Sequence, residues 1–94
     1  MPPRFQVHVT SRFRRDAQRL LKQHPELTDL LEQLRDVLQA DPHCRSREHD
    51  IHKLTGIGQG EGQWRLRVGD YRLRYDIIGH DVVLYSFRHR REVY

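Results

Sequence analysis

Four arginines alternate with apolar and aromatic residues in one short stretch of the chain, GQWRLRVGDYRLRY at residues 62–75. Arginine is planar and always protonated, and its fork of N–H donors fits a phosphate with two parallel hydrogen bonds. A rigid element that holds several forks at fixed separation suits a polyphosphate backbone better than a single small anion. The chemistry that this stretch predicts is phosphate binding.

The stretch is expected to form a β-hairpin, because its side chains alternate with a period of two on both sides of Gly69-Asp70, a two-residue turn signal. With these two residues in the turn, one face is wholly apolar or aromatic, with Val68 opposite Tyr71, Leu66 opposite Leu73 and Trp64 opposite Tyr75. The other face places Arg67 opposite Arg72 and Arg65 opposite Arg74.

These opposed arginines need a physical reason, because like charges directly opposite one another destabilise a sheet, by about a few tenths to 1 kcal/mol per pair. An anionic ligand is the simplest reason. The alternative is a solvated face on which the guanidiniums splay apart or pair with the nearby carboxylates Asp70, Asp76 and Asp81.

The chain has 94 residues and no break in composition, which predicts a single domain over residues 1–94.

Composition agrees with an anionic partner. Arginine makes up 15 of the 17 basic residues, and from Gly62 onward seven basic and four acidic residues give +3 of the net charge of +4. The positive excess therefore accompanies the hairpin, and the arginine bias favours bidentate contacts over mere solubility.

Metal and cofactor chemistry are not expected. Cys44 is the single cysteine, so it forms no intrachain disulfide, and its spacing from His43, His49 and His52 matches no familiar zinc pattern. The glycine-rich string at residues 56–62 leads into a strand and does not open a helix, which argues against a dinucleotide cofactor. No apolar run is long enough for a signal peptide or a membrane span, so the cytoplasm is the expected location.

The elements around the hairpin predict an α+β fold. Phe5, Val7 and Val9 alternate as a short strand that is expected to join the sheet of the hairpin. Two amphipathic helices follow, one capped by Thr10 or Ser11 and one that runs from Pro25 to the Asp41-Pro42 break, and they are expected to form an antiparallel hairpin. An antiparallel strand meander then packs on the helices. It begins near residues 51–54 and ends with residues 82–87, an apolar run typical of a central strand covered on both faces.

The chain ends in a basic tail, RHRREVY at residues 88–94. Since only seven residues follow Phe87, Arg90 and Tyr94 must stay near the end of the last strand, where they can meet the arginines of the hairpin. His80 and His89 are the histidines that this pattern places near the basic face.

The order of strand, two helices and strand meander, with the blocks GQWRLRVGDYRLRYDI and HRREVY, resembles the RelE/ParE superfamily of toxins from type II toxin-antitoxin pairs. The resemblance spans almost the whole chain, and its most specific part is WRLRVGDYRLRY. It implies a small α+β domain with an antiparallel sheet. The RelE branch cuts mRNA in the ribosomal A site, and the terminal tyrosine favours that branch.

The resemblance also implies a set of site residues. Arg72, Arg90 and Tyr94 match catalytic positions of the RelE branch, and Arg65 and Arg67 match its two basic residues before the hairpin turn. Arg74 and His89 are expected to add RNA contacts. Some relatives have lysines where this chain has Arg65 and Arg67, and arginine cannot act as a base near neutral pH. The proton acceptor therefore stays open among Tyr94, His89 and Glu92.

The implied reaction is metal-independent cleavage of mRNA, in which the 2′-hydroxyl attacks the adjacent phosphate and leaves a 2′,3′-cyclic phosphate and a 5′-hydroxyl. The implied partners are a cognate antitoxin, mRNA and the ribosome, and operator DNA through the antitoxin complex. Two alternatives remain. One is a ParE-like toxin that binds DNA gyrase and cuts nothing, and the other is an inactive relative that only binds an antitoxin.

Overall fold

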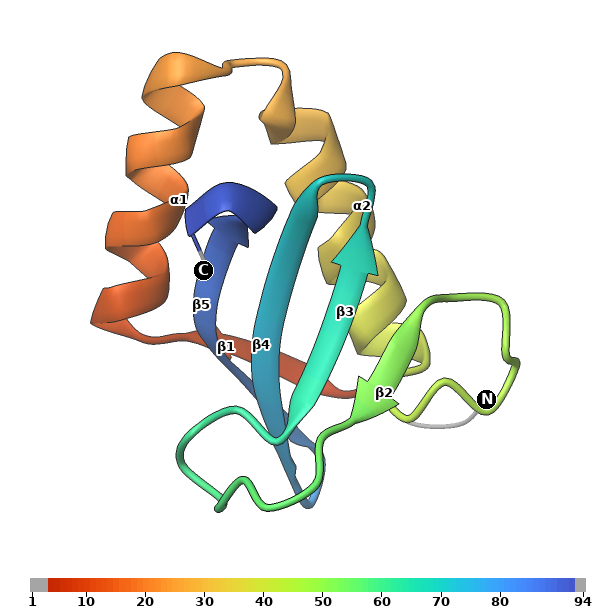
Figure 1. Cartoon of the computed structure of the whole chain (residues 1–94). Helices are drawn as coiled ribbons and strands as arrows, with labels where there is room; N and C mark the ends of the chain where they lie inside the picture. Colours follow the sequence, from red (N-terminus) through yellow and green to blue (C-terminus); the bar gives the residue numbers. More distant parts are fainter. Residues whose placement is uncertain (1–3, 93–94) are drawn as a thin grey trace.

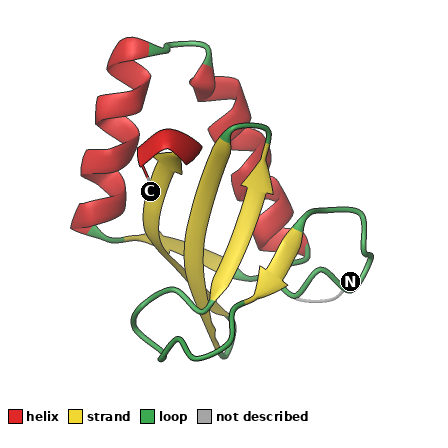
Figure 2. Cartoon of the chain, viewed as in Figure 1, coloured by secondary structure: helices red, strands yellow, loops and turns green. Residues whose placement is uncertain are grey.

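The structure is a computed structural model that describes residues 4–92, with the side chains of residues 4–91. The elements in chain order are β1 (Gln6–Val9), α1 (Ser11–Gln23), α2 (Leu27–Ala40), β2 (Ile51–Lys53), β3 (Trp64–Val68), β4 (Tyr71–Ile78), β5 (Asp81–His89) and the short 3-10 helix η1 (Arg90–Glu92). Figure 1 shows the helices against a twisted sheet, and Figure 2 shows how strands and helices alternate with loops. The predicted α+β class and order of elements are confirmed.

The described strands form one five-stranded sheet in the order β1-β5-β4-β3-β2. The pairs from β2 to β5 are antiparallel, which confirms the meander, and the register of the hairpin is the predicted one, with Arg67 opposite Arg72 and Arg65 opposite Arg74. β1 joins the sheet as expected, but it pairs in parallel with β5 and not with a strand of the hairpin.

β5 agrees with its prediction in one respect and differs in another. It is an interior strand, between β1 and β4, although β4 is the middle one. Its apolar run is covered by the helices on one face only, where Val82, Leu84 and Phe87 are buried, while Val83 and Tyr85 are half-buried on the other face. A β-bulge explains why Leu84 and Phe87 are both buried although they are three residues apart, because Arg74 pairs with Ser86 and Tyr75 with Leu84, which leaves Tyr85 as an extra residue.

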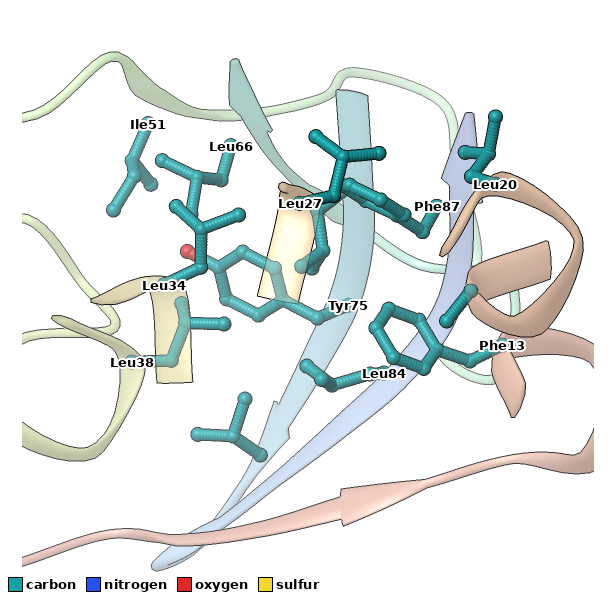
Figure 3. Close-up of a cluster of buried hydrophobic side chains, with 13 residues drawn as sticks. Phe13, Leu20, Leu27, Leu34, Leu38, Ile51, Leu66, Tyr75, Leu84 and Phe87 are labelled. Carbon is teal, nitrogen blue, oxygen red and sulfur yellow. The ribbon is translucent and has the colours of Figure 1, made fainter. Parts of the chain in front are cut away.

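Both helices use their apolar stripes to cover the same face of the sheet (Figure 1). The side chain of Thr10 accepts a hydrogen bond from the Phe13 amide and so caps α1, as predicted. The same hydroxyl donates to the carbonyl of Leu84, which fixes the start of α1 to β5. The buried side chains that meet between helices and sheet, shown in Figure 3, include Phe13, Leu20, Leu34, Leu38, Leu66, Tyr75, Leu84 and Phe87.

A buried carboxylate completes the edge of β5. β1 pairs with β5 only as far as Leu84, so the later amides of β5 need other acceptors. Asp16 of α1 is 6% exposed, and its Oδ2 accepts a hydrogen bond of 3.1 Å from the amide of Phe87. The helix thus replaces the missing strand at this point, because an unpaired buried amide would cost about 1–3 kcal/mol.

Tyr75 ties the middle of the sheet to the segment after α2. Its ring is fully buried and stacks on Trp64, and its hydroxyl donates a 2.7 Å hydrogen bond to the carbonyl of Pro42. Burial raises the pKa of Tyr75 far above its ordinary value.

We expect Tyr75→Phe to lower the free energy of unfolding by about 1–3 kcal/mol at neutral pH, because the Pro42 carbonyl loses its donor inside the protein. The raised pKa also sets a pH dependence: the contribution of the hydroxyl is complete below the pKa of about 10 that tyrosine has in the unfolded chain, and it is lost as the pH rises above that value. Urea unfolding of both proteins at pH 7 and at about pH 10.5–11 measures the difference. Equal stability at pH 7, or a difference that grows with pH, would contradict this assignment.

Candidate nucleic-acid interface

The face of the sheet opposite the helices carries arginines in two rows. In the first row, Arg67 of β3, Arg72 of β4 and Arg88 of β5 lie opposite one another on adjacent strands. In the second row, Arg65 and Arg74 are neighbours, flanked by His52 of β2 and Ser86 of β5. We call this surface of Arg65, Arg67, Arg72, Arg74 and Arg88 the arginine face. Neighbouring strands are about 4.8 Å apart, so the guanidiniums of each row start from closely spaced positions.

Carboxylates meet the first row at its two ends. Arg67 donates from Nε to Oδ2 of Asp50, and Arg88 Nε lies 3.7 Å from Oδ2 of Asp16. The hydrogen bond from Arg67 is the main reason why the pKa of Asp50 lies below its ordinary value, against the opposing effect of desolvation. Arg72, in the middle of the row, donates from Nη1 to the backbone carbonyls of Gly69 and Tyr71.

Two guanidinium nitrogens on this face lack a hydrogen bond. Among the described residues, Nε of Arg65 and Nε of Arg88 are buried and have no hydrogen-bond acceptor, although Arg88 keeps its long ion pair. Buried donors are nearly always satisfied in folded proteins, and the exceptions concentrate where a ligand, ion or water is expected. The arginine face therefore contains two buried donors that the contacts of the described residues do not satisfy.

Arg74 also shapes the loop between β2 and β3. It donates from Nε to the carbonyl of Gly62 at 2.8 Å and from Nη2 to that of Glu61 at 3.1 Å. Gly62 has a φ of +82°, and a Cβ there would lie 3.0 Å from Cβ of Arg74. Glycine is required at this position because both the backbone conformation and the close approach of Arg74 exclude a side chain.

Asp76, two residues after Arg74 in β4, holds the same loop. The carboxylate is fully buried and accepts hydrogen bonds from the amides of Gly60 and Gln63. It also bonds to Tyr85, the extra residue of the β5 bulge, whose pKa is raised by burial and further by the charge and hydrogen bond of Asp76. The loop, the bulge and Arg74 together form one border of the arginine face.

The turn of the hairpin forms another border, and there the basic tail returns. The backbone amide of Arg90, the first residue of η1, donates a 2.6 Å hydrogen bond to the backbone carbonyl of Asp70. Its side-chain Nε lies 3.4 Å from Oδ1 of the Asp70 carboxylate. His89 lies edge-on to Tyr71 with Nε2 3.9 Å from Asp70. Arg90 thus stays near the hairpin as predicted, but its contacts are with Asp70 of the turn, and the predicted meeting of Arg90 and Tyr94 with the hairpin arginines stays a prediction.

The solvated-face alternative named three acids as partners of the hairpin arginines, and the structure uses all three elsewhere. Asp70 meets the tail, Asp76 binds loop amides, and Asp81 pairs with His8 of β1 at 2.9 Å. The carboxylates that do reach the arginine face, Asp50 and Asp16, come from other segments. The opposed arginines are thus only partly neutralised by the protein itself.

Among the predicted site residues, Arg65, Arg67, Arg72 and Arg74 share one face, and Arg90 and His89 lie at its turn end. Tyr94 lies outside the described residues, as does the side chain of Glu92, so their roles stay predictions. His80 was predicted to lie near the basic face, and this prediction is wrong, because its ring lies against Phe5 at the turn between β4 and β5.

Sequence reasoning missed two residues of this face, Arg88 and His52. Arg88 belongs to it because β5 continues to His89, two residues beyond the predicted end, which puts Arg88 opposite Arg72. His52 belongs to it because Ile51 is buried, so the next side chain of the same strand points to the arginine face. The alternation of Ile51 with His52 indicates that the histidine lies on the polar face of the strand. The nearby Cys44 and histidines led us to consider His52 only as a metal ligand instead.

In the part of the chain that the structure describes, no group of three or more histidine, cysteine, aspartate or glutamate side chains is arranged to hold a metal ion. Cys44 instead donates from Sγ to the carbonyl of His49. Within residues 4–92, no helix has both the length and the apolar character needed to cross a membrane.

Comparison with known proteins shows the family and the fold of this chain. A sequence profile described as "ParE toxin of type II toxin-antitoxin system, parDE" matches residues 7–94. The chain belongs to this family. The toxin also resembles a chain of the crystal structure of the RelB-RelE antitoxin-toxin complex from Methanococcus jannaschii, with a TM-score of 0.59 and 19% identity over 92% of this chain and 93% of that one. At that identity the similarity establishes the fold, and no curated protein matches the sequence.

Family and fold together identify the chain as a type II toxin of the RelE/ParE superfamily, as the resemblance of the hairpin and tail predicted.

We expect Asp76→Ala to release the border loop, because the amides of Gly60 and Gln63 lose their shared acceptor. Hydrogen exchange measured by NMR should become faster at both amides, and the free energy of unfolding should fall by about 1–3 kcal/mol. Asp81→Ala is the matched control, since its carboxylate meets only the exposed His8 among the hydrogen bonds found, and it should change stability by less than about 0.5 kcal/mol. Unchanged exchange at Gly60 and Gln63 in Asp76→Ala would show that the loop is held by other contacts.

Proposed function

We propose that this toxin is a metal-independent mRNA endoribonuclease that acts on the ribosome, in the cytoplasm. The observation that carries the proposal is the row of Arg67, Arg72 and Arg88 on three adjacent strands, on the face that neither helix covers. Arginines in line on a rigid sheet can bind successive phosphates of one strand at once. A face built only for solubility would not need to oppose like charges directly.

The residues of the row divide the work by position. Arg72 is in the middle, and its contacts with the Gly69 and Tyr71 carbonyls hold its side chain without neutralising its charge. It is the best placed to stabilise the additional negative charge that develops on the scissile phosphate, an effect of about 3–4 kcal/mol for a well-placed donor. Arg67 and Arg65 would hold the neighbouring phosphates, and Arg90 would approach from the turn end.

The reaction uses the substrate itself as the nucleophile. The 2′-oxygen forms a bond to the adjacent phosphorus as its proton leaves, and the bond from phosphorus to the 5′-oxygen breaks. The products are a 2′,3′-cyclic phosphate and a 5′-hydroxyl. Arginine supplies charge but no base, so the protein must add a proton acceptor near the arginine face.

A second candidate function follows from the family match, whose description names the ParE toxin. In that case the same arginines would contact DNA gyrase or its DNA without cutting anything. Inhibition of gyrase supercoiling by the purified toxin, with mRNA left intact, would favour this function.

The antitoxin partner is also proposed, by analogy with the complex that contains the similar structure. Between α1 and α2 the structure has an apolar groove of about 320 Å³, lined by Val7, Val9, Phe13, Leu31, Leu34 and Leu84 among others. Val9 is 44% exposed there, although most large apolar side chains are covered. Glu32 and Arg35 of α2 also line the groove, so its occupant would be an amphipathic antitoxin helix with an apolar stripe and flanking charges.

For the arginine face we expect Arg72→Ala to lower the rate of mRNA cleavage on ribosomes by about 100-fold or more, with the fold unchanged. Primer extension on mRNA incubated with ribosomes and purified toxin measures the cleavage, and circular dichroism checks the fold. Arg14→Ala is the control. It removes an exposed arginine of α1, so it has the same net charge as Arg72→Ala, and it should cleave like the wild type. A folded Arg72→Ala protein with full activity would overturn the assignment of the site.

For the groove we expect Val9→Asp to weaken antitoxin binding by at least about tenfold, because a carboxylate would have to be buried against an apolar partner. Calorimetric titration with the cognate antitoxin measures the affinity. Gln18→Asp, at an exposed position of α1 away from the groove, adds the same charge and should bind normally. Wild-type affinity of Val9→Asp would exclude the groove as the antitoxin site.

A further inference from the structure

An imidazole and a carboxylate form a pair at one edge of the arginine face. Nε2 of His52 lies 3.0 Å from Oδ1 of Asp50. The other oxygen of the same carboxylate accepts the hydrogen bond from Nε of Arg67. One carboxylate thus connects the histidine directly to the first arginine row.

The position of His52 brings it next to the second row as well. β2 pairs with β3 so that His52 lies opposite Arg65, which in turn lies opposite Arg74. Side chains opposite one another on antiparallel strands have Cβ atoms about 4.5–5.5 Å apart. The His52 side chain is 64% exposed, so a ligand bound along the arginines can reach its ring.

Arg67 holds Asp50 in place through both its backbone and its side chain. The backbone carbonyl of Asp50 accepts the Arg67 amide at 2.9 Å, in addition to the side-chain contact. The same hydrogen bond from Arg67 keeps the pKa of Asp50 low, so its carboxylate stays ionised. An ionised acceptor at Nε2 fixes that nitrogen as the N–H donor and leaves Nδ1 as the free base of the neutral ring.

We propose that His52, oriented by Asp50, is the proton acceptor of the cleavage reaction. This inference rests on the proposed ribonuclease function. Nδ1 of His52 takes the proton of the 2′-hydroxyl while the 2′-oxygen bonds to phosphorus. The 5′-oxygen leaves with the electron pair of the broken bond and takes a proton from water, and the imidazolium then returns its proton to water. Asp50 is a positioning residue in this scheme.

The other histidines near acids are less suitable. The ring of His89 packs edge-on against Tyr71, and its Nδ1 already accepts a hydrogen bond from the Arg91 amide at 3.2 Å. His8 forms a similar exposed pair with Asp81. Its neighbours across the sheet are Val83 of β5 and then Asp76 of β4, so it lies in neither arginine row. Only the pair of His52 and Asp50 joins a histidine to both arginine rows among the residues described.

The test compares His52→Gln with the wild type in cleavage and in binding. Glutamine can still donate to Asp50, so the fold and the Arg67 contact should persist. We expect the single-turnover rate of cleavage on ribosomes to fall by about 100-fold or more. The affinity for the same RNA with a 2′-O-methyl group at the cleavage site should change by less than about threefold, because the arginines that bind phosphate remain.

The pH profile separates proton transfer from a structural role. The wild-type rate should rise with pH, as expected of a reaction that needs a general base, and His52→Gln should lose this rise. The charged groups that face His52 are Asp50 from its own edge and Arg65 and Arg67 from β3, and all three are retained in the variant. His8→Gln, which removes the other exposed histidine–aspartate pair, should keep both the rate and the profile.

Each outcome decides a different question. Cleavage by His52→Gln at the wild-type rate, or with the wild-type pH profile, would overturn the role of His52 and leave the ribonuclease function standing. A wild-type toxin that cleaves no mRNA with or without ribosomes would overturn the function and this inference together. Equal loss of cleavage and of binding in His52→Gln would reduce His52 to a phosphate contact.

Discussion

Burial of one face of the hairpin allows like charges to stay side by side on the other. Leu66, Leu73 and Tyr75 are almost wholly inaccessible to solvent beneath the helices. Burying a large apolar side chain contributes about 1.5–3 kcal/mol, whereas each pair of opposed arginines costs at most about 1 kcal/mol. The apolar face therefore determines the register, and the arginines must accept the positions that this register gives them.

The distribution of acids follows the same logic. Asp50 and Asp16 meet the first arginine row at its two ends. Each also has a second contact: Asp50 with His52 of the edge strand β2, and Asp16 with the backbone amide of Phe87 in β5. The middle of the row is left to backbone carbonyls, which hold Arg72 but do not cancel its charge. The carboxylates therefore offset the positive charge at the two ends of the first row and leave the charge of Arg72 in the middle without a carboxylate partner among the contacts described.

The sequence was sufficient for the features that depend on local alternation. The hairpin register, the two amphipathic helices and the Thr10 cap all follow from neighbouring residues, and so do the predicted arginine pairs. The parallel pairing of β1 with β5 could not be read in this way, because four alternating residues define a face but neither a partner nor a direction. Where β5 ends depends on the turn of the hairpin and on Asp16, which accepts the Phe87 amide, and this is why Arg88 was missed. His52 was missed because a three-residue strand gives too short a period to outweigh the histidines and cysteine beside it.

The pairing of β1 with β5 has a consequence for how the toxin is made. Gln6 meets Asp81 across almost the entire chain, so the first strand has no partner in the sheet until the last one has been synthesised. Contacts so distant in sequence close slowly, because the loop between them must first lose its conformational entropy. Arg88, which completes the first row of arginines, arrives on that same last strand. Until β5 has left the ribosome, the nascent chain therefore lacks both the partner of β1 and Arg88, so the sheet and the arginine face are completed in the same step.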